Sequence, residues 1–134
     1  MIYGIGTDIL NSDRIKKLRN KYNHKFLNKF FGKEEIQISK SKSNKNLFFS
    51  KRFAAKEAFW KAISPIEPGS IKFKDIQIIS EINGKPKIKI SGETLKFIGN
   101  IERSINNKFH FYISLSDEPP TVLAFVIIFL APNE

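Results

Sequence analysis

One stretch of the sequence gathers charged side chains of the kinds that take part in catalysis. The segment KRFAAKEAFWKA, residues 51–62, contains one carboxylate and three cations: Glu57, Arg52, Lys56 and Lys61. On a helix, Glu57 and Lys61 are i,i+4 neighbours, and Arg52 and Lys56 are spaced in the same way. Pairs of this kind often belong to a solvated face and contribute only about 0.3–0.5 kcal/mol each. The segment becomes a candidate site only if another part of the chain supplies a partner.

Asp8 is the second carboxylate that could complete such a site. It follows GIGT in a short apolar strand predicted over residues 1–10, where an aspartate either builds a site or forms a turn. Mg²⁺ usually takes one or two protein carboxylates and fills its octahedron with water and phosphate oxygens. Asp8 and Glu57 could supply these carboxylates, and the nearby cations could balance the remaining phosphate charge. These residue types therefore indicate Mg²⁺ with a polyphosphate.

A strand and a long helix must bring these groups together. In the first strand, Gly4 and Gly6 allow another backbone to approach closely. The helix is predicted to start from an asparagine cap, Asn44 or Asn46, and to end near Ile63, before a Ser-Pro pair. A stripe of small residues on this helix also favours close backbone packing. The stripe consists of Ala54, Ala55, Ala58 and Ala62.

The remaining periodicity predicts a single α+β domain over residues 1–134, with antiparallel strands mostly in its second half. Asn83 and Gly84 form the strongest turn signal in the chain and would join two strands into a hairpin. Ser91 would cap the helix that follows this hairpin. The predicted helices are 13–20, 24–31, 33–38 and 92–105, and the predicted later strands are 72–80, 85–90, 109–116 and 121–129.

The last predicted strand, TVLAFVIIF, is apolar on both faces. A strand with one face in water would alternate between apolar and polar residues. A strand without that alternation is central with both faces covered, or it lies in a subunit interface. We therefore expect an oligomer.

The overall composition narrows the class of protein. The chain has no cysteine, which removes disulfides and thiolate sites and fits a reducing compartment. The net charge of +10 indicates an anionic partner, although a compositional drift toward lysine could also produce it. No signal-peptide pattern opens the chain, and the most apolar run, 121–131, is about half the ~20 residues that a membrane span needs. A cytoplasmic protein without a membrane partner is expected.

Five stretches of the chain resemble the holo-[acyl-carrier-protein] synthases, the small bacterial 4′-phosphopantetheinyl transferases. They are GIGTDIL at 4–10, FFGKEE at 30–35, FFSKRFAAKEAFWKA at 48–62, DIQI with NGKP at 75–86, and SLS with AFVII at 114–128. The resemblance implies an antiparallel sheet packed against a long central helix, in a homotrimer with a coenzyme A site between neighbouring subunits. Such a trimer would account for the doubly apolar last strand and for the alanine stripe.

The resemblance also implies an activity. The enzyme would move 4′-phosphopantetheine from coenzyme A to a serine of apo acyl carrier protein, for fatty acid biosynthesis, and release adenosine 3′,5′-bisphosphate. Asp8 and Glu57 would be the Mg²⁺ ligands, and Lys61 would stabilise or protonate the leaving phosphate. Glu57, or a metal-bound water held by it, is the candidate base for the serine, since no histidine falls within these motifs.

Further residues would bind the two substrates. By resemblance, Arg52 and Lys56 would contact coenzyme A phosphates or shape its pocket. The segment of Gly84, Lys85 and Pro86 would line the adenine end. Arg14 and Lys17, on the first predicted helix, would attract the acidic acyl carrier protein through complementary charge.

Two stretches depart from the family pattern. The loop KAISPIEPGS, 61–70, has two prolines where relatives usually have a glycine-rich turn, and Asp117 stands where they typically have histidine. Both changes are expected to alter coenzyme A affinity without removing the catalytic groups.

Two other classes of function remain as alternatives. A nucleic-acid module would use the lysines together with stacking aromatics, namely Phe48, Phe49, Trp60 and Tyr112. These aromatics occupy apolar periodic positions, however, and no groove-reading helix is recognisable, so no nucleic-acid partner is expected. The second alternative is a carrier-protein binder that has lost transfer activity.

Overall fold

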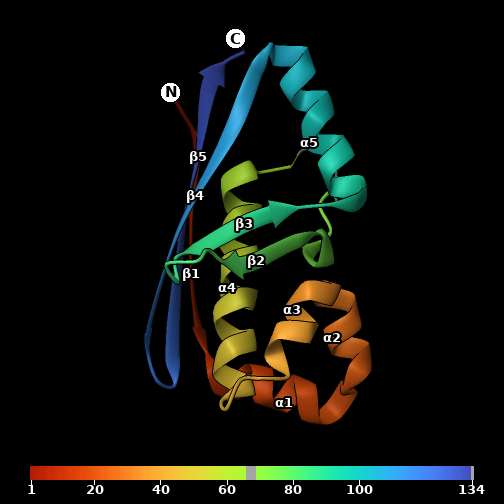
Figure 1. Ribbon diagram of the computed structural model, residues 1–134, viewed down its shortest axis with the longest axis vertical. Helices are drawn as coiled ribbons and strands as arrows, with labels where there is room; N and C mark the ends of the chain where they lie inside the picture. The colour runs from red at the N-terminus through yellow and green to blue at the C-terminus, as the bar shows by residue number, and fades with distance from the viewer. Residues whose placement is uncertain (66–68, 134) are drawn as a thin grey trace.

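The computed structural model describes residues 1–65 and 69–133. A three-stranded antiparallel sheet has the order β1-β5-β4, which makes the last strand central in the sheet. Its strands are β1 (Ile2–Asn11), β4 (Asn107–Glu118) and β5 (Thr121–Pro132). Figure 1 shows the described helices on one side of this sheet, with the other side uncovered. The α+β prediction is confirmed.

The long helix α4 (Lys45–Ile63) runs along the sheet and organises the other helices around it. Asn44 is its cap, because the Asn44 side chain accepts a hydrogen bond from the Leu47 amide at 3.0 Å. Three short helices gather near the start of α4, and α5 lies near its other end (Figure 1). They are α1 (Ser12–Tyr22), α2 (His24–Phe30), α3 (Lys33–Ser39) and α5 (Gly92–Ile105).

A separate two-stranded hairpin, β2 (Ile76–Ser80) and β3 (Pro86–Ile90), crosses α4 in Figure 1. Its turn has the expected glycine, with Gly84 at a φ of 85° that favours a residue without a side chain. The first strand is shorter than predicted. It begins at Ile76 because Phe73–Asp75 form a 3₁₀ turn, closed by a 3.0 Å hydrogen bond from the Asp75 amide to the Lys72 carbonyl.

Asp75 also explains how α5 begins. Ser91 occupies the predicted N-cap position, but its side chain makes no capping hydrogen bond. The Asp75 carboxylate accepts instead from the Thr94 amide at 3.3 Å and from the Thr94 hydroxyl at 2.9 Å. A side chain from outside the helix therefore satisfies one backbone amide of the first turn.

Helix α4 and strand β1 pack with their backbones close together. A Cβ atom added to Gly6 would lie 1.9 Å from the Ala58 carbonyl oxygen, and one added to Gly4 would lie 1.9 Å from that of Ala62. The glycines therefore allow the close approach that the sequence predicted. The alanine stripe packs within the chain, however, and not against a second subunit as the trimer explanation supposed.

The two faces of β5 differ. On the inner face, Val122, Ala124, Val126 and Ile128 are fully buried against α4 and its neighbours. On the outer face the large apolar side chains stay accessible in the single chain. These include Leu123, Phe125 and Phe129 of β5, together with Ile5 and Ile9 of the neighbouring β1, with Ile9 70% exposed. Of the two alternatives for this strand, a subunit interface remains open.

Candidate functional site

Asp8 and Lys61 meet at the inner edge of the sheet. Asp8 lies opposite Ala124 of β5, so its side chain points toward α4. The Lys61 ammonium nitrogen is 3.2 Å from Asp8 Oδ1 and donates to the Thr7 carbonyl at 2.9 Å. The Lys61 side chain is 49% exposed and that of Asp8 17% exposed, so both can still reach a ligand. The structure thus joins two predicted site residues that are 53 positions apart.

Glu57 belongs to the same group, one helical turn before Lys61. Partial burial raises the pKa of Glu57, and the negative charge of Asp8 raises it further. Arg14 and Lys61 act on this pKa in the opposite direction. The two carboxylates are therefore near enough to repel each other, and a divalent cation between them would remove that repulsion.

This donor set fits Mg²⁺. Two carboxylates match the small number that Mg²⁺ takes from a protein, and open coordination positions are left for water and phosphate. Within the described residues, no group of three or more His, Cys, Asp or Glu side chains could hold a metal. Asp8 and Glu57 would hold such an ion together with oxygen ligands from outside the protein.

Arg14 links this group to a cavity of about 370 Å³ between α1, α2 and α4. Its guanidinium lies 5.7 Å from the centre of the Phe53 ring, while its charge acts on Glu57. The cavity has an aromatic and aliphatic floor and a basic rim. Its lining includes Arg14, Leu18, Phe26, Lys29, Phe30 and Phe53.

Lys56 does not join the acidic pair, although it precedes Glu57 in the sequence. Its ammonium nitrogen is fully buried, 2.7 Å from Glu35 Oε1 and 2.8 Å from the Phe73 carbonyl, and it also donates to the Ile76 carbonyl. Burial lowers the pKa of Lys56 to about 8, although Glu35 opposes the shift. A direct contact with a phosphate would require these bonds to break, so the geometry favours a pocket-shaping role.

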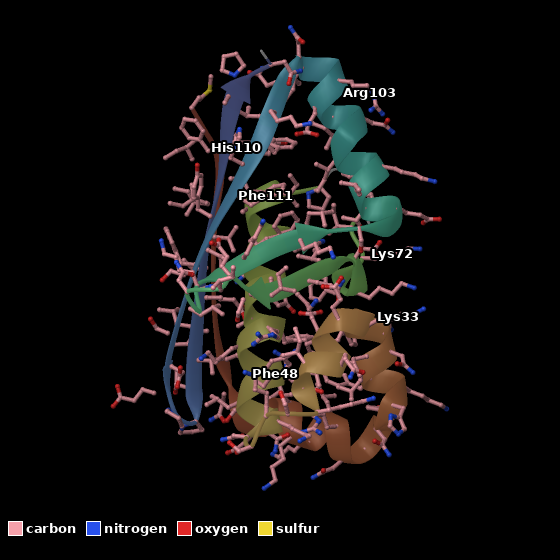
Figure 2. The ribbon with its side chains drawn as sticks, in the orientation of Figure 1. Lys33, Phe48, Lys72, Arg103, His110 and Phe111 are labelled. Carbon is pink, nitrogen blue, oxygen red and sulfur yellow. The ribbon has the colours of Figure 1, made fainter. Side chains whose placement is uncertain are left out.

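Arg52 lies on another side of α4, more than two turns before Lys61. Its Nε donates to the Ile78 carbonyl at 3.1 Å, and its guanidinium stacks 3.7 Å from the centre of the Phe48 ring (Phe48 is labelled in Figure 2). Burial lowers the pKa of Arg52 to about 10, so it remains charged at neutral pH. A cavity of about 280 Å³ beside it is also lined by Lys42 and Lys51.

Asp117, the departure from the family pattern, pairs with this second cationic group. Its carboxylate is 3.1 Å from the Lys51 ammonium. Lys51 therefore balances the negative charge of Asp117. Of the other departing segment, residues 66–68 lie outside the described part of the chain.

A family model described as the 4′-phosphopantetheinyl transferase superfamily matches residues 4–115. The chain belongs to this family. A holo-[acyl-carrier-protein] synthase of Wolbachia pipientis subsp. Culex pipiens is 43% identical, over 96% of this chain and 98% of that protein. One from Zymomonas mobilis is 42% identical, over 99% of this chain and 100% of that protein.

Solved structures of such transferases share the fold. The holo-[acyl-carrier-protein] synthase of Neisseria meningitidis superposes with a TM-score of 0.85 at 35% identity, covering 96% of this chain and 99% of that chain. The Helicobacter pylori enzyme, solved in complex with coenzyme A, gives a TM-score of 0.73 at 29% identity, covering 93% of this chain and 99% of that chain. The antiparallel sheet with a long central helix is therefore the fold of this transferase family.

Sequence reasoning missed Glu35, the partner of Lys56. It noted the FFGKEE stretch but gave Glu35 no role. A sequence signal was present, since Glu35 lies between Phe31 and Ile36, in a segment with several apolar residues that is expected to pack inward.

Proposed function

We propose that this transferase moves 4′-phosphopantetheine from coenzyme A to a serine of apo acyl carrier protein, releasing adenosine 3′,5′-bisphosphate. The observation that carries the proposal is the partly exposed cluster of Asp8, Glu57 and Lys61. In this cluster, two carboxylates and an ammonium group from β1 and α4 lie close together. Relatives bearing the name of this activity match nearly the whole chain at about 40% identity.

In this proposal, Asp8 and Glu57 hold Mg²⁺, whose positive charge would neutralise the pyrophosphate during transfer. Lys61 turns from Asp8 to the leaving phosphate and donates a hydrogen bond or a proton to it. Glu57, or a water that it holds, accepts the proton of the attacking serine. A carboxylate at this position is a suitable proton acceptor because no histidine lies within the motifs that build the site.

Coenzyme A would be held further along by the cationic group of Arg52 and Lys51 and by the hairpin turn. Arg52 bonds to the strand that leads into Gly84, Lys85 and Pro86, so the cations and the predicted adenine-binding turn are neighbours. Lys56 would shape this pocket from behind.

The acyl carrier protein would dock at the cavity between α1, α2 and α4. An acidic amphipathic helix fits a surface with an apolar floor and a basic rim. Arg14 and Lys17 would contact its carboxylates. Because Arg14 also acts electrostatically on Glu57, a protein docked here would present its serine close to the proposed base.

The proposed working form is a cytoplasmic homotrimer with coenzyme A sites between subunits, serving fatty acid biosynthesis. The support is the accessible apolar face of β1 and β5, which has no cover in the single chain. Light scattering should then give three times the 15.4 kDa chain mass. Phe125→Glu should reduce that mass.

Mass spectrometry of apo acyl carrier protein tests the activity. After incubation with coenzyme A, Mg²⁺ and this protein, the carrier should gain one phosphopantetheine, and Asp8→Asn should abolish the gain. No gain, with carrier binding intact, would instead support the binder that has lost transfer activity.

A further inference from the structure

Glu35 and Lys56 form an ion pair that no solvent reaches. Their side chains are both 0% exposed, and the Nζ to Oε1 distance is 2.7 Å. Removing two charges from water costs several kcal/mol per ion unless further hydrogen bonds complete the shell of each charge. The buried pair therefore depends on further hydrogen bonds from the groups that surround it.

Besides the Phe73 carbonyl and the Gly32 amide, the surrounding groups belong to the free edge of strand β2. Among the described strands, β2 pairs only with β3, and an isolated two-stranded hairpin is marginally stable. On its other edge, the Ile76 carbonyl accepts from Lys56, and the Ile78 amide donates to Glu35 Oε2 at 3.0 Å. The Ile78 carbonyl accepts from Arg52 Nε at 3.1 Å. Three charged side chains thus replace a third strand.

Helix α3 and strand β2 are joined by hydrogen bonds from a side chain of each element to the backbone of the other. Gln77 Oε1 accepts from the backbone amides of Glu34 and Glu35 at the start of α3, at 3.0 and 3.3 Å. In return, Glu35 reaches from α3 to the backbone of β2, while its Oε1 also accepts from the Gly32 amide at 3.0 Å. Buried hydrogen bonds therefore join helix α3, helix α4 and β2 into one packed unit.

This unit fixes where the hairpin turn lies. The turn follows β2 directly and contains Gly84 and Lys85, and Pro86 begins β3; these three residues are proposed to line the adenine end of coenzyme A. We propose that Glu35 and Lys56 are positioning residues for coenzyme A: they hold the hairpin at a fixed place on α4 without touching the ligand. This inference rests on the proposed function and adds how its substrate pocket is set.

Glu35→Gln, alone and combined with Lys56→Met, tests this role. Both variants should raise the Kd and KM for coenzyme A by about tenfold or more while kcat at saturating coenzyme A stays within about threefold, because only substrate positioning is lost. The KM for carrier protein should not change. The double variant removes both charges together and so avoids an unpaired buried ion.

Glu34→Gln is the matched control. Glu34 is the neighbouring residue on α3 and also forms an ion pair with the hairpin, through Lys89 of β3, but both side chains are about half exposed (48% and 47%). Losing this exposed pair should change the Kd for coenzyme A by less than about twofold.

Several results would overturn the inference. An unchanged Kd with kcat reduced in step with the folded fraction would show a purely structural pair. If the wild type binds coenzyme A without transferring phosphopantetheine, the proposed function fails, but the Kd comparison still decides the positioning role. If both variants fail to fold, hydrogen exchange of the wild type decides. Coenzyme A should slow exchange of the Ile78 amide and of the hairpin turn, and no slowing would refute the role.

Discussion

Helix α4 supplies the lysines of two lysine–carboxylate pairs that differ in their surroundings. Lys56 lies 2.7 Å from Glu35 with both side chains wholly buried, and its other partners are backbone carbonyls. Lys61 lies 3.2 Å from Asp8 with its side chain half exposed, and a second carboxylate, Glu57, stands next to Asp8. The first pair has all its bonding capacity used by the protein, while the second keeps capacity for a ligand.

The difference shows what separates a structural ion pair from a chemical one. Residue type and pair distance are nearly the same in both. Solvent access and unsatisfied charge distinguish them, because a group can act on a substrate only if it has bonds left to make.

The largest contrast should appear in stability. Lys56→Met strands the buried Glu35 carboxylate and should lower the free energy of unfolding by about 3–5 kcal/mol. Lys61→Met removes a half-exposed partner and should lower it by less than about 1 kcal/mol. Urea unfolding followed by circular dichroism measures both. Equal losses would mean that burial does not distinguish the two pairs.

Catalytic activity should depend more on the partly exposed carboxylates than on the buried pair. Asp8→Asn and Glu57→Gln should each reduce kcat for phosphopantetheine transfer by about 100- to 1,000-fold, the range found when a group that stabilises transition-state charge is removed. The free energy of unfolding of these two variants should change little. Glu35→Gln is the matched carboxylate-to-amide control for the loss of kcat. A Glu57→Gln variant that kept metal binding, coenzyme A binding and wild-type turnover would show that Glu57 is not the base.

The open group extends to Arg14, and charge reversal there should have a smaller effect. Arg14→Glu with Lys17→Glu should raise the KM for carrier protein by about tenfold, because complementary charge speeds encounter and orients docking. The KM for coenzyme A should stay the same. Lys96→Glu with Arg103→Glu, on α5 at the other end of the molecule, is the control. An equal loss for both substrates would indicate a folding defect.

The smallest effect concerns the pH dependence of stability. Because the pKa of Glu57 is raised in the folded protein, its ionised form opposes folding above that pKa, and this opposition vanishes as the pH falls below about 4.5, its unfolded value. Without metal, Glu57→Gln should therefore raise Tm at pH 7–8, by at most about 3 °C because the group is partly exposed. Added Mg²⁺ should raise Tm of the wild type more than that of the variant. A variant less stable than the wild type without metal would contradict the repulsion between the two carboxylates.

Local signals in the sequence predicted most elements of the fold. The Asn44 cap and the turn at Asn83 and Gly84 depend on neighbouring residues only, and the structure confirms them. The strand predicted from residue 72 failed at its start because Asp75 bonds with Thr94 of α5, a partner that periodicity does not reveal. The alanine stripe indicated a close backbone neighbour but could not say whether that neighbour belonged to the same chain.

The residues of the candidate site were also predictable from the sequence, but their tertiary partners were not. Asp8, Glu57 and Lys61 were chosen from residue type, spacing and resemblance, and the structure brings them together. Helical spacing grouped Lys56 with Arg52 as one cationic pair. The true partner of Lys56 is Glu35, 21 positions earlier, and only tertiary packing brings it there.

Helix α4 can pack this closely on β1 because Gly4 and Gly6 have no side chains. Asp8 follows Gly6 on the same face of the strand, so this spacing also decides whether its carboxylate meets Lys61. A single methyl group at either glycine would lift the helix and separate the site while leaving every functional group in the chain. Systematic mutagenesis should therefore find the lowest tolerance to substitution at Gly4 and Gly6, two residues without a functional side chain.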